Sequence, residues 1–533
     1  MIKRKVVSIA LAGILMISML AGCGSPEGNK DAANTEAAPE TTQETQKQEA
    51  ADSSTAGDKE EITLSIVWCV SKDVAPDHGP VNRLLKDKFN INVEWTDIGS
   101  STPSEQLNLL FSTGEFPELI WNYNGEKDIK RWASQGYLIP ASDYYEKLPN
   151  YRALYTDDEW NEMLTYASNS DGKVYYTPNK NYRSASQAWL YRMGMLEELG
   201  KSVPATTEEL YDLLKAYKEA YPDSIPIANR WGFNNLLGGF ALAFRTNTNL
   251  FFDPDTQQLA YGPATDKYRD MLIYVEKLYA EGLIDPEFQT ATDTQWEEIY
   301  ANGLNIAEYS YTNRAVWANN AMINADPDAD WQWVDTFITA YPDKEALVSH
   351  ELSYQNTGGF VMTKALSDEK LERWLEFADW AVSEEGQRWF SMGEEGITYE
   401  MADGKPVLLP EIYSVSNPEG KTLEQLGYGY FLIRAEESLE QIGYADDLKL
   451  SRAIAGKEYL KTVAYNLTEE QEKSLIDPET QINDIFQEYT LRFITGSLDP
   501  SDDGNWNEYL ERLQKAGLDE VLNTRRTAVI VAK

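Results

Sequence analysis

The chain has 533 residues, which is too many for one hydrophobic core, so two or three domains are expected. Its 47 basic and 87 acidic residues give a formal charge of −40, which argues against nucleic acid or anionic lipid surfaces as partners. Only two cysteines occur, so no disulfide framework is expected to hold the fold.

The first 22 residues are typical of a signal peptide, because a basic start at residues 3–5 precedes a short apolar run over 6–20. Leu20-Ala21-Gly22-Cys23 resembles the lipobox of bacterial lipoproteins, in which the cysteine takes a diacylglycerol and becomes the first mature residue. The alternative is a plain secretory leader with an accidental cysteine. Two acyl chains anchor a protein stably, so we expect attachment through Cys23 to the outer face of the cytoplasmic membrane.

The segment after the cysteine is predicted to be a disordered tether. Residues 24–60 contain no Leu, Ile, Val or aromatic residue and cannot bury enough apolar surface to fold. A flexible chain of this length reaches roughly 30 to 35 Å, enough to hold a folded body clear of lipid head groups. Such a long acidic tether favours a bacterium with a single membrane.

Folded structure is expected from about residue 61. The pattern predicts strands at 62–68, 91–95 and 118–121, with helices at 81–90 and 104–113 between them. Strands that alternate with helices indicate a mostly parallel sheet covered by helices. The fold class is therefore α/β, with ligands expected at the carboxyl ends of the strands.

Later helices are predicted from caps and apolar spacing. Thr206 and Glu209 form a potential capping box at the start of one helix. A second helix is predicted over 266–280, and a third begins near Ser367 and breaks near 385–386.

The sequence offers little material for catalysis. His78 and His350 are the only histidines, and neither lies in a nucleophile motif or in a set of zinc ligands. No phosphate-binding loop occurs, so no catalytic residue, cofactor or metal is assigned. The acidic loops at 253–255 and 326–330 are interpreted as solvated loops in preference to calcium sites. Cys69 is expected to be a small buried apolar residue at a strand end.

Aromatic residues point to carbohydrate. The chain has 15 Trp and 32 Tyr, several of them beside Asn, Asp or Arg at predicted strand ends or in loops. A sugar offers one face of C–H groups and a rim of hydroxyls, which an aromatic floor edged by polar groups matches. Core packing is the commoner fate of any single tryptophan. Trp121 and Trp231 are expected to be exceptions, because hydrophilic or glycine-rich residues follow each of them.

Five segments carry a family resemblance: residues 131–151, 171–178, 191–217, 375–400 and 493–522. They resemble the extracellular solute-binding lipoproteins of carbohydrate ABC importers, in particular the large oligosaccharide and aldouronate-type group. The most specific is the Ser383-Glu384-Glu385-Gly386-Gln387 block, which is followed by Gly393-Glu394-Glu395-Gly396. Met193-Gly194-Met195 departs from the charged pattern usual at that place in the family.

The resemblance implies a two-lobed, type II periplasmic-binding-protein-like fold, with a ligand cleft between lobes joined by crossing strands. Lobe 1 would comprise residues 61–180 and 340–395, and lobe 2 residues 181–339 and 396–533. It also implies a monomer that passes its cargo to the permease subunits of the importer.

Closure of a cleft requires ligand contacts from both lobes, and this requirement selects the candidate binding residues. From lobe 1 they are Trp68, Asp73, Trp121, Asn122 and Asn356. From lobe 2 they are Trp231, Asn234, Glu308, Tyr311, Arg314 and Trp317, and Glu395 lies at the last crossing.

The leading hypothesis is a tethered receptor that captures an extracellular oligosaccharide without making or breaking bonds. A cell-surface glycoside hydrolase is the first alternative, since two carboxylates suffice for that chemistry and this chain has many. A binding protein for peptides or other small polar solutes is the second, and most of the aromatic residues would then belong to the core.

Overall fold

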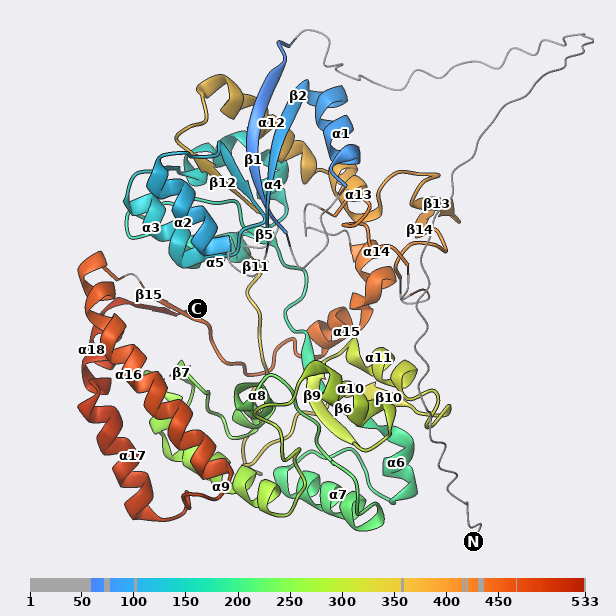
Figure 1. Cartoon of the computed structure of the whole chain (residues 1–533), viewed down its shortest axis with the longest axis vertical. Helices are drawn as coiled ribbons and strands as arrows, with labels where there is room; N and C mark the ends of the chain where they lie inside the picture. The colour runs from blue at the N-terminus through green and yellow to red at the C-terminus, as the bar shows by residue number, and fades with distance from the viewer. Residues whose placement is uncertain are drawn as a thin grey trace, which may run out of the picture. The chain divides into compact units, whose positions relative to one another are not determined.

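The computed structural model describes most of the chain beyond the expected tether (Figure 1). The described residues are 59–70, 77–99, 103–355, 359–414, 417, 420–429, 436–465 and 467–531. The expected signal peptide, Cys23 and residues 24–58 of the tether lie outside them, as do the candidate residues Asp73 and Asn356. No helix among the described residues combines the length and the apolar character needed to cross a membrane.

The first sheet has five strands in the order β2-β1-β3-β12-β4. β1 (Ile62–Val70) runs parallel to both β2 (Ile91–Gly99) and β3 (Leu119–Trp121). β12 (Phe360–Thr363) lies antiparallel between β3 and β4 (Leu138–Ile139). The predicted series of strands and helices over 62–121 is therefore confirmed, and a strand from much later in the chain completes the sheet.

Seven helices pack their apolar faces into the core around this sheet. They are α1 (Gly79–Phe89), α2 (Pro103–Thr113), α3 (Glu126–Ser134), α4 (Pro149–Ala153), α5 (Asp157–Ala167), α12 (Asp368–Ala381) and α13 (Glu384–Met392). The helix predicted from near Ser367 is confirmed as α12, whose N-cap is Ser367. Its break lies a few residues before the predicted 385–386, because α12 ends at Ala381 and Ser383 caps α13 by accepting a hydrogen bond from the Gly386 amide. Gly386 is required there, since a Cβ would lie 2.2 Å from the Trp380 carbonyl oxygen.

The second sheet repeats the strand order of the first. β6 (Gln187–Arg192) lies antiparallel between β9 (Ala307–Tyr311) and β10 (Trp331–Trp333). Parallel bridges join Ile227 to Ala307 on one side and to Ile284 on the other. The two sheets therefore have the same sequence of two parallel pairings followed by two antiparallel ones. In the first sheet the order is β2, β1, β3, β12, β4, and in the second it is Ile284, Ile227, β9, β6, β10.

The shared topology determines which candidate residues lie at the carboxyl ends of the parallel segments. In each sheet the carboxyl ends of the two central parallel segments lie side by side, where α/β sheets bind their ligands. Asn122 follows β3 in the first sheet. Trp231 follows Ile227 and Arg314 follows β9 in the second sheet.

Helices from two distant parts of the chain build the second core. They are α6 (Met193–Glu198), α7 (Thr207–Ala220), α8 (Phe233–Ala243), α9 (Asp266–Ala280), α10 (Asp293–Ala301), α11 (Arg314–Ala321), α16 (Glu469–Ile494), α17 (Asp503–Lys515) and α18 (Leu518–Ala528). The helix predicted over 266–280 is confirmed as α9. The capping box expected at Thr206 is only half formed, because the Glu209 carboxylate accepts from the Ala205 amide and not from that of Thr206.

The remaining elements are short. They are β5 (Asn179–Lys180), β7 (Leu250–Asp253), β8 (Gln258–Tyr261), β11 (Tyr354–Gln355), β13 (Tyr399–Ala402), β14 (Lys405–Leu408), β15 (Val463–Tyr465), β16 (Val529–Val531), the 3₁₀ helices η2 (Ala141–Lys147) and η3 (Gly262–Ala264), α14 (Glu436–Leu439), the π-helical turn η4 (Glu440–Tyr444) and α15 (Ala445–Ala453). β5, which lies where the chain is expected to cross first between lobes, pairs antiparallel with β11, which lies within the expected lobe 1. The lobe boundaries themselves stay a prediction.

The contact between α8 and β9 generates the first testable prediction. A Cβ at Gly239 would lie 2.6 Å from Cγ of Tyr309, whereas a Cβ at the neighbouring Gly238 would come no closer than 3.9 Å to that ring. Gly239→Ala should therefore destabilise the protein by about 1 to 3 kcal/mol through overpacking. Gly238→Ala is the matched control, and it should be neutral or slightly stabilising because alanine favours the helix. Equal urea-unfolding free energies for the two variants would contradict this close packing.

Candidate ligand-binding site

Four planar groups form a column in the second sheet's half of the molecule. The Arg230 guanidinium lies between two indoles, 3.8 Å from the ring centre of Trp231 and 3.9 Å from that of Trp296. Trp296, on α10, stacks in turn on Trp317 of α11, with ring centres 4.5 Å apart. A guanidinium over an indole face is attracted by the ring's negative quadrupole, and the attraction is strongest where water is excluded.

Trp231 is the exposed end of this column. Its side chain is 54% exposed, so the prediction that Trp231 lies outside the core is confirmed. Its backbone has φ 63°, a left-handed conformation that is rare for a bulky residue. The Asn229 side chain holds the turn by donating to the carbonyls of Gly232 and Phe288, each at 3.0 Å. The turn therefore presents one indole face to solvent at the cost of local strain.

Glu308 is buried beside Trp296 and does not reach the protein surface. The side chain is 2% exposed, and it accepts hydrogen bonds from the Trp296 indole at 3.2 Å and from the Tyr300 hydroxyl. Burial raises the pKa of Glu308 to about 7. A ligand contact from Glu308 stays a prediction, and in the structure its buried carboxylate fixes the orientation of Trp296.

Three further candidates lie near the carboxyl end of the second sheet. Tyr311 is exposed at the end of β9, and Arg314 is half-buried at the start of α11. Burial lowers the pKa of the Arg230 guanidinium, and the positive charge of nearby Arg314 lowers it further. Asn234 is exposed in the first turn of α8, three residues after Trp231.

The candidates of the first sheet are placed differently. Trp121 is completely buried and packs edge-on against Trp68 and Trp374, so the expectation that Trp121 lies outside the core is wrong. Trp68 is equally buried and offers no face to a ligand. Asn122, in the left-handed region with φ 62°, donates from Nδ2 to the Cys69 carbonyl at 2.8 Å and so joins the ends of β3 and β1.

Glu395 is exposed in the turn between α13 and β13, apart from the column. That region has a surface cavity of about 640 Å³, whose lining includes Arg83 of α1, Ile397, Lys421 and Tyr428. None of the candidate residues lines it.

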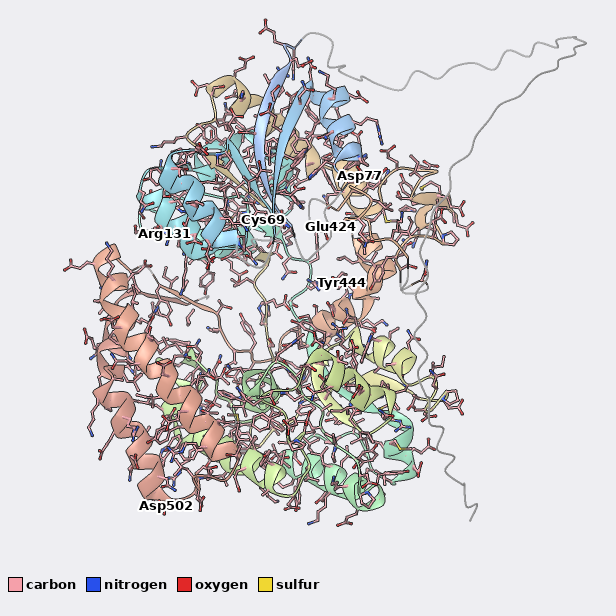
Figure 2. All side chains as sticks on the ribbon, viewed as in Figure 1. Cys69, Asp77, Arg131, Glu424, Tyr444 and Asp502 are labelled. Atoms are coloured by element: carbon pink, nitrogen blue, oxygen red, sulfur yellow. The ribbon has the colours of Figure 1, made fainter. Side chains whose placement is uncertain are left out.

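Hydrogen bonds connect the ligand-side end of β9 to a segment expected to cross between lobes. The buried Asp447 of α15 accepts from the Thr312 hydroxyl and from Nη1 of Arg183, the latter at 2.8 Å. The Arg183 guanidinium also lies 4.4 Å from the ring centre of Tyr444, which is labelled in Figure 2. The loop that carries Tyr311 and Arg314 is thus fixed to the segment that follows β5.

Cys69 and the acidic loop at 253–255 lie among the described residues. Cys69, near the end of β1 in Figure 2, is free and buried as expected, and burial raises its thiol pKa to about 12. In the 253–255 loop Asp255 binds Arg245, Lys267 and Lys344, and their charges outweigh burial to lower its pKa. No group of metal-ligating side chains occurs among the described residues.

Sequence reasoning missed the residues that organise the column. Arg230 is 4% exposed and lies in the loop before α8, and its partner Trp296 lies on α10, 66 residues further along the chain. The only local signal for Arg230 was its place beside Trp231, after a short apolar segment. Tyr300 carried no signal of its own.

Known proteins match both the sequence and the fold. The family model of the bacterial extracellular solute-binding proteins matches residues 81–407. Lipoprotein LipO of Bacillus subtilis is 21% identical, over 88% of this chain and 92% of its own length. The polygalacturonan/rhamnogalacturonan-binding protein YtcQ of the same organism is 23% identical, over 66% of this chain and 69% of its own length. The structure of the substrate-binding protein FusA of S. pneumoniae with kestose has a TM-score of 0.66 at 20% identity, covering 87% of this chain and 98% of that one, which shows a shared fold.

The raised pKa of Glu308 generates a pH prediction. Between pH 4.5 and about 7 the folded protein holds a proton at Glu308 that the unfolded chain releases, so stability is lost as the pH rises through this window. Glu308→Gln cannot titrate. On passing from about pH 4.5 to about pH 8, the wild type should lose up to about 3 kcal/mol of unfolding free energy relative to this variant. Urea unfolding of both proteins at several pH values measures the difference, and a difference independent of pH would rule out the buried titration.

Proposed function

We propose, since the chain belongs to the bacterial extracellular solute-binding proteins, that it captures an oligosaccharide outside the cell and delivers it to an ABC importer permease. The observation that carries the proposal is the exposed Trp231 indole, which packs on the Arg230 guanidinium. Tyr311 and Arg314 follow β9 at the same end of the sheet, and Asn234 lies in the first turn of α8. An aromatic face with polar groups at its edge matches the C–H face and hydroxyl rim of a sugar.

The named functions of the relatives agree with this proposal. YtcQ is named for binding polygalacturonan and rhamnogalacturonan, and FusA is named as the substrate-binding protein of a fructooligosaccharide ABC transporter. Both are binding proteins, so the proposed role needs no bond-making step. On this account the protein acts as a monomer, and bound sugar stabilises a closed form only by the difference in its contacts with the two forms.

Isothermal titration calorimetry with xylo-, manno-, gluco-, galacto- and fructo-oligosaccharides, and with acidic oligosaccharides, tests the proposal. Stoichiometric binding of at least one sugar without turnover is expected. Release of reducing sugar during the titration would indicate a glycoside hydrolase instead. Binding confined to a peptide library would assign the protein to another class of solute.

Trp231→Ala should weaken binding of the selected sugar by about 1 to 3 kcal/mol, because a stacking face is lost. The melting temperature should change little, since the side chain is mostly exposed. Trp231→Phe should recover part of the affinity, and Tyr221→Ala, at an exposed tyrosine after α7, should have no effect on it. A large loss of stability with unchanged affinity would mean that Trp231 serves packing only.

The proposal includes anchoring by a lipid at Cys23 on the outer face of the cytoplasmic membrane, and the lipoprotein name of LipO supports it. Cys23→Ala, expressed in a bacterium that processes lipoproteins, should abolish incorporation of a labelled fatty acid and release the protein from the membrane fraction. Cys69→Ala is the control and should stay labelled. Retention of label in Cys23→Ala would contradict the anchor.

A further inference from the structure

Trp231 has a backbone conformation that aromatic residues rarely adopt. Its φ is 63°, and the next residue, Gly232, has φ 78°. Within the ranges that the structure describes, no other aromatic residue has a positive φ. In the left-handed region the Cβ of an L-residue crowds the following carbonyl oxygen, so glycine or asparagine is the usual occupant. A strained residue persists only where the surrounding structure imposes its conformation, and such strain is concentrated at ligand sites.

The side chain of Asn229 makes hydrogen bonds that hold this turn. Asn229 is 2% exposed, and its Nδ2 donates to the Gly232 carbonyl at 3.0 Å, which closes a ring of backbone around Trp231. Nδ2 also donates to the Phe288 carbonyl at 3.0 Å, and Oδ1 accepts from Nδ2 of Asn235 at 3.1 Å. The whole amide is therefore used inside the protein. An aspartate of the same shape could not make the two donations.

A second loop supports the same turn. Gln289 lies in the loop after Ile284, whose segment runs parallel to the segment that leads to Trp231. The Gln289 side chain accepts a hydrogen bond through Oε1, at 3.1 Å, from the amide of Phe233, the first residue of α8. A Cβ at Gly232 would lie 3.3 Å from this oxygen, so the two loops approach closely just after Trp231. The turn is thus held by one side chain before Trp231 and by another from the second loop.

We propose that Asn229 and Gln289 are positioning residues of the candidate site, which hold the Trp231 indole in place for a sugar before any ligand arrives. This inference rests on the proposed function and adds two residues that act through Trp231. The stack on Arg230 orients the ring, whereas the bonds of Asn229 and Gln289 fix the backbone that carries it. A preformed face spares the ligand the cost of ordering it. The apparent affinity therefore rises with the fraction of molecules in which the indole is correctly placed.

The first test needs no ligand. Glycine is favoured over alanine at a left-handed position, so W231G should have an unfolding equilibrium constant about fivefold lower than that of W231A. In the N229A background the turn is free to leave this region, and the advantage of glycine should fall to about twofold or less. Q289A should reduce the advantage in part. Urea unfolding of these proteins measures each difference.

Gln257 is the matched control for the first test. It is exposed in the turn between β7 and β8, and its φ is 55°. Q257G should likewise be more stable than Q257A. Because this turn has no contact with Asn229 in the hydrogen-bond network described above, N229A should leave that difference unchanged.

The second test is a double-mutant cycle on affinity. The probe is the tightest binder among xylo-, manno-, gluco-, galacto- and fructo-oligosaccharides, measured by calorimetry. N229A should weaken binding by about threefold to thirtyfold when Trp231 is present, and by less than about twofold in the W231A background. Q289A, at an exposed side chain, should show the same dependence on Trp231 with a smaller effect. Q257A should bind as the wild type does.

The outcomes separate this inference from the proposed function. A glycine advantage at position 231 that neither N229A nor Q289A reduces would overturn the inference, because the turn would then be held by other groups. Equal losses of affinity with and without the indole would also overturn it, since the two residues would not act through Trp231. If N229A does not fold, Q289A decides both tests. Failure of the whole panel to bind the wild type would overturn the proposed function, and the unfolding comparison would still decide whether these side chains hold the turn.

Discussion

The candidate site depends on one interaction, the Arg230 guanidinium held between the indoles of Trp231 and Trp296. A guanidinium is costly to bury, and here two aromatic faces, the nearby Glu308 carboxylate and a pairing with Asp293 offset the cost. Because Arg230 occupies the inner face of Trp231, the outer face of that indole remains in solvent. The left-handed backbone at Trp231 orients one indole of this stack. The hydrogen bond from Trp296 to the buried Glu308 orients the other.

The sheet topology explains why the site forms where it does. Both sheets have the same order, with one antiparallel strand supplied from a distant part of the chain, β12 in the first and β6 in the second. The loops that leave the central parallel segments therefore gather at one edge of each sheet. The bonds from Thr312 and Arg183 to Asp447 then join the edge of the second sheet to the segment that follows β5. A ligand that holds the β9 loop is thus mechanically connected to a segment expected to cross between lobes.

Local patterns predicted the elements well, because the strands and helices over 62–121 and the helix over 266–280 follow from apolar spacing alone. The local pattern did not predict whether an individual aromatic residue is buried or exposed. Trp121 and Trp231 have similar hydrophilic neighbours, yet Trp121 is buried by β12 and α12, which come from far along the chain. Arg230 was missed for the same reason, since its second aromatic partner lies on α10. The burial of Glu308 had no local signal either, since it depends on donors from Trp296 and Tyr300.

The central claim is that the exposed face of the Trp231 indole, with Arg230 against its other side, forms the recognition surface for a sugar. A crystal structure of the protein with the oligosaccharide selected by calorimetry tests it most directly. The account predicts one sugar ring stacked on the solvent face of the Trp231 indole. A ligand bound elsewhere, such as in the cavity beside Arg83 and Tyr428, with Trp231 still in solvent, would contradict it.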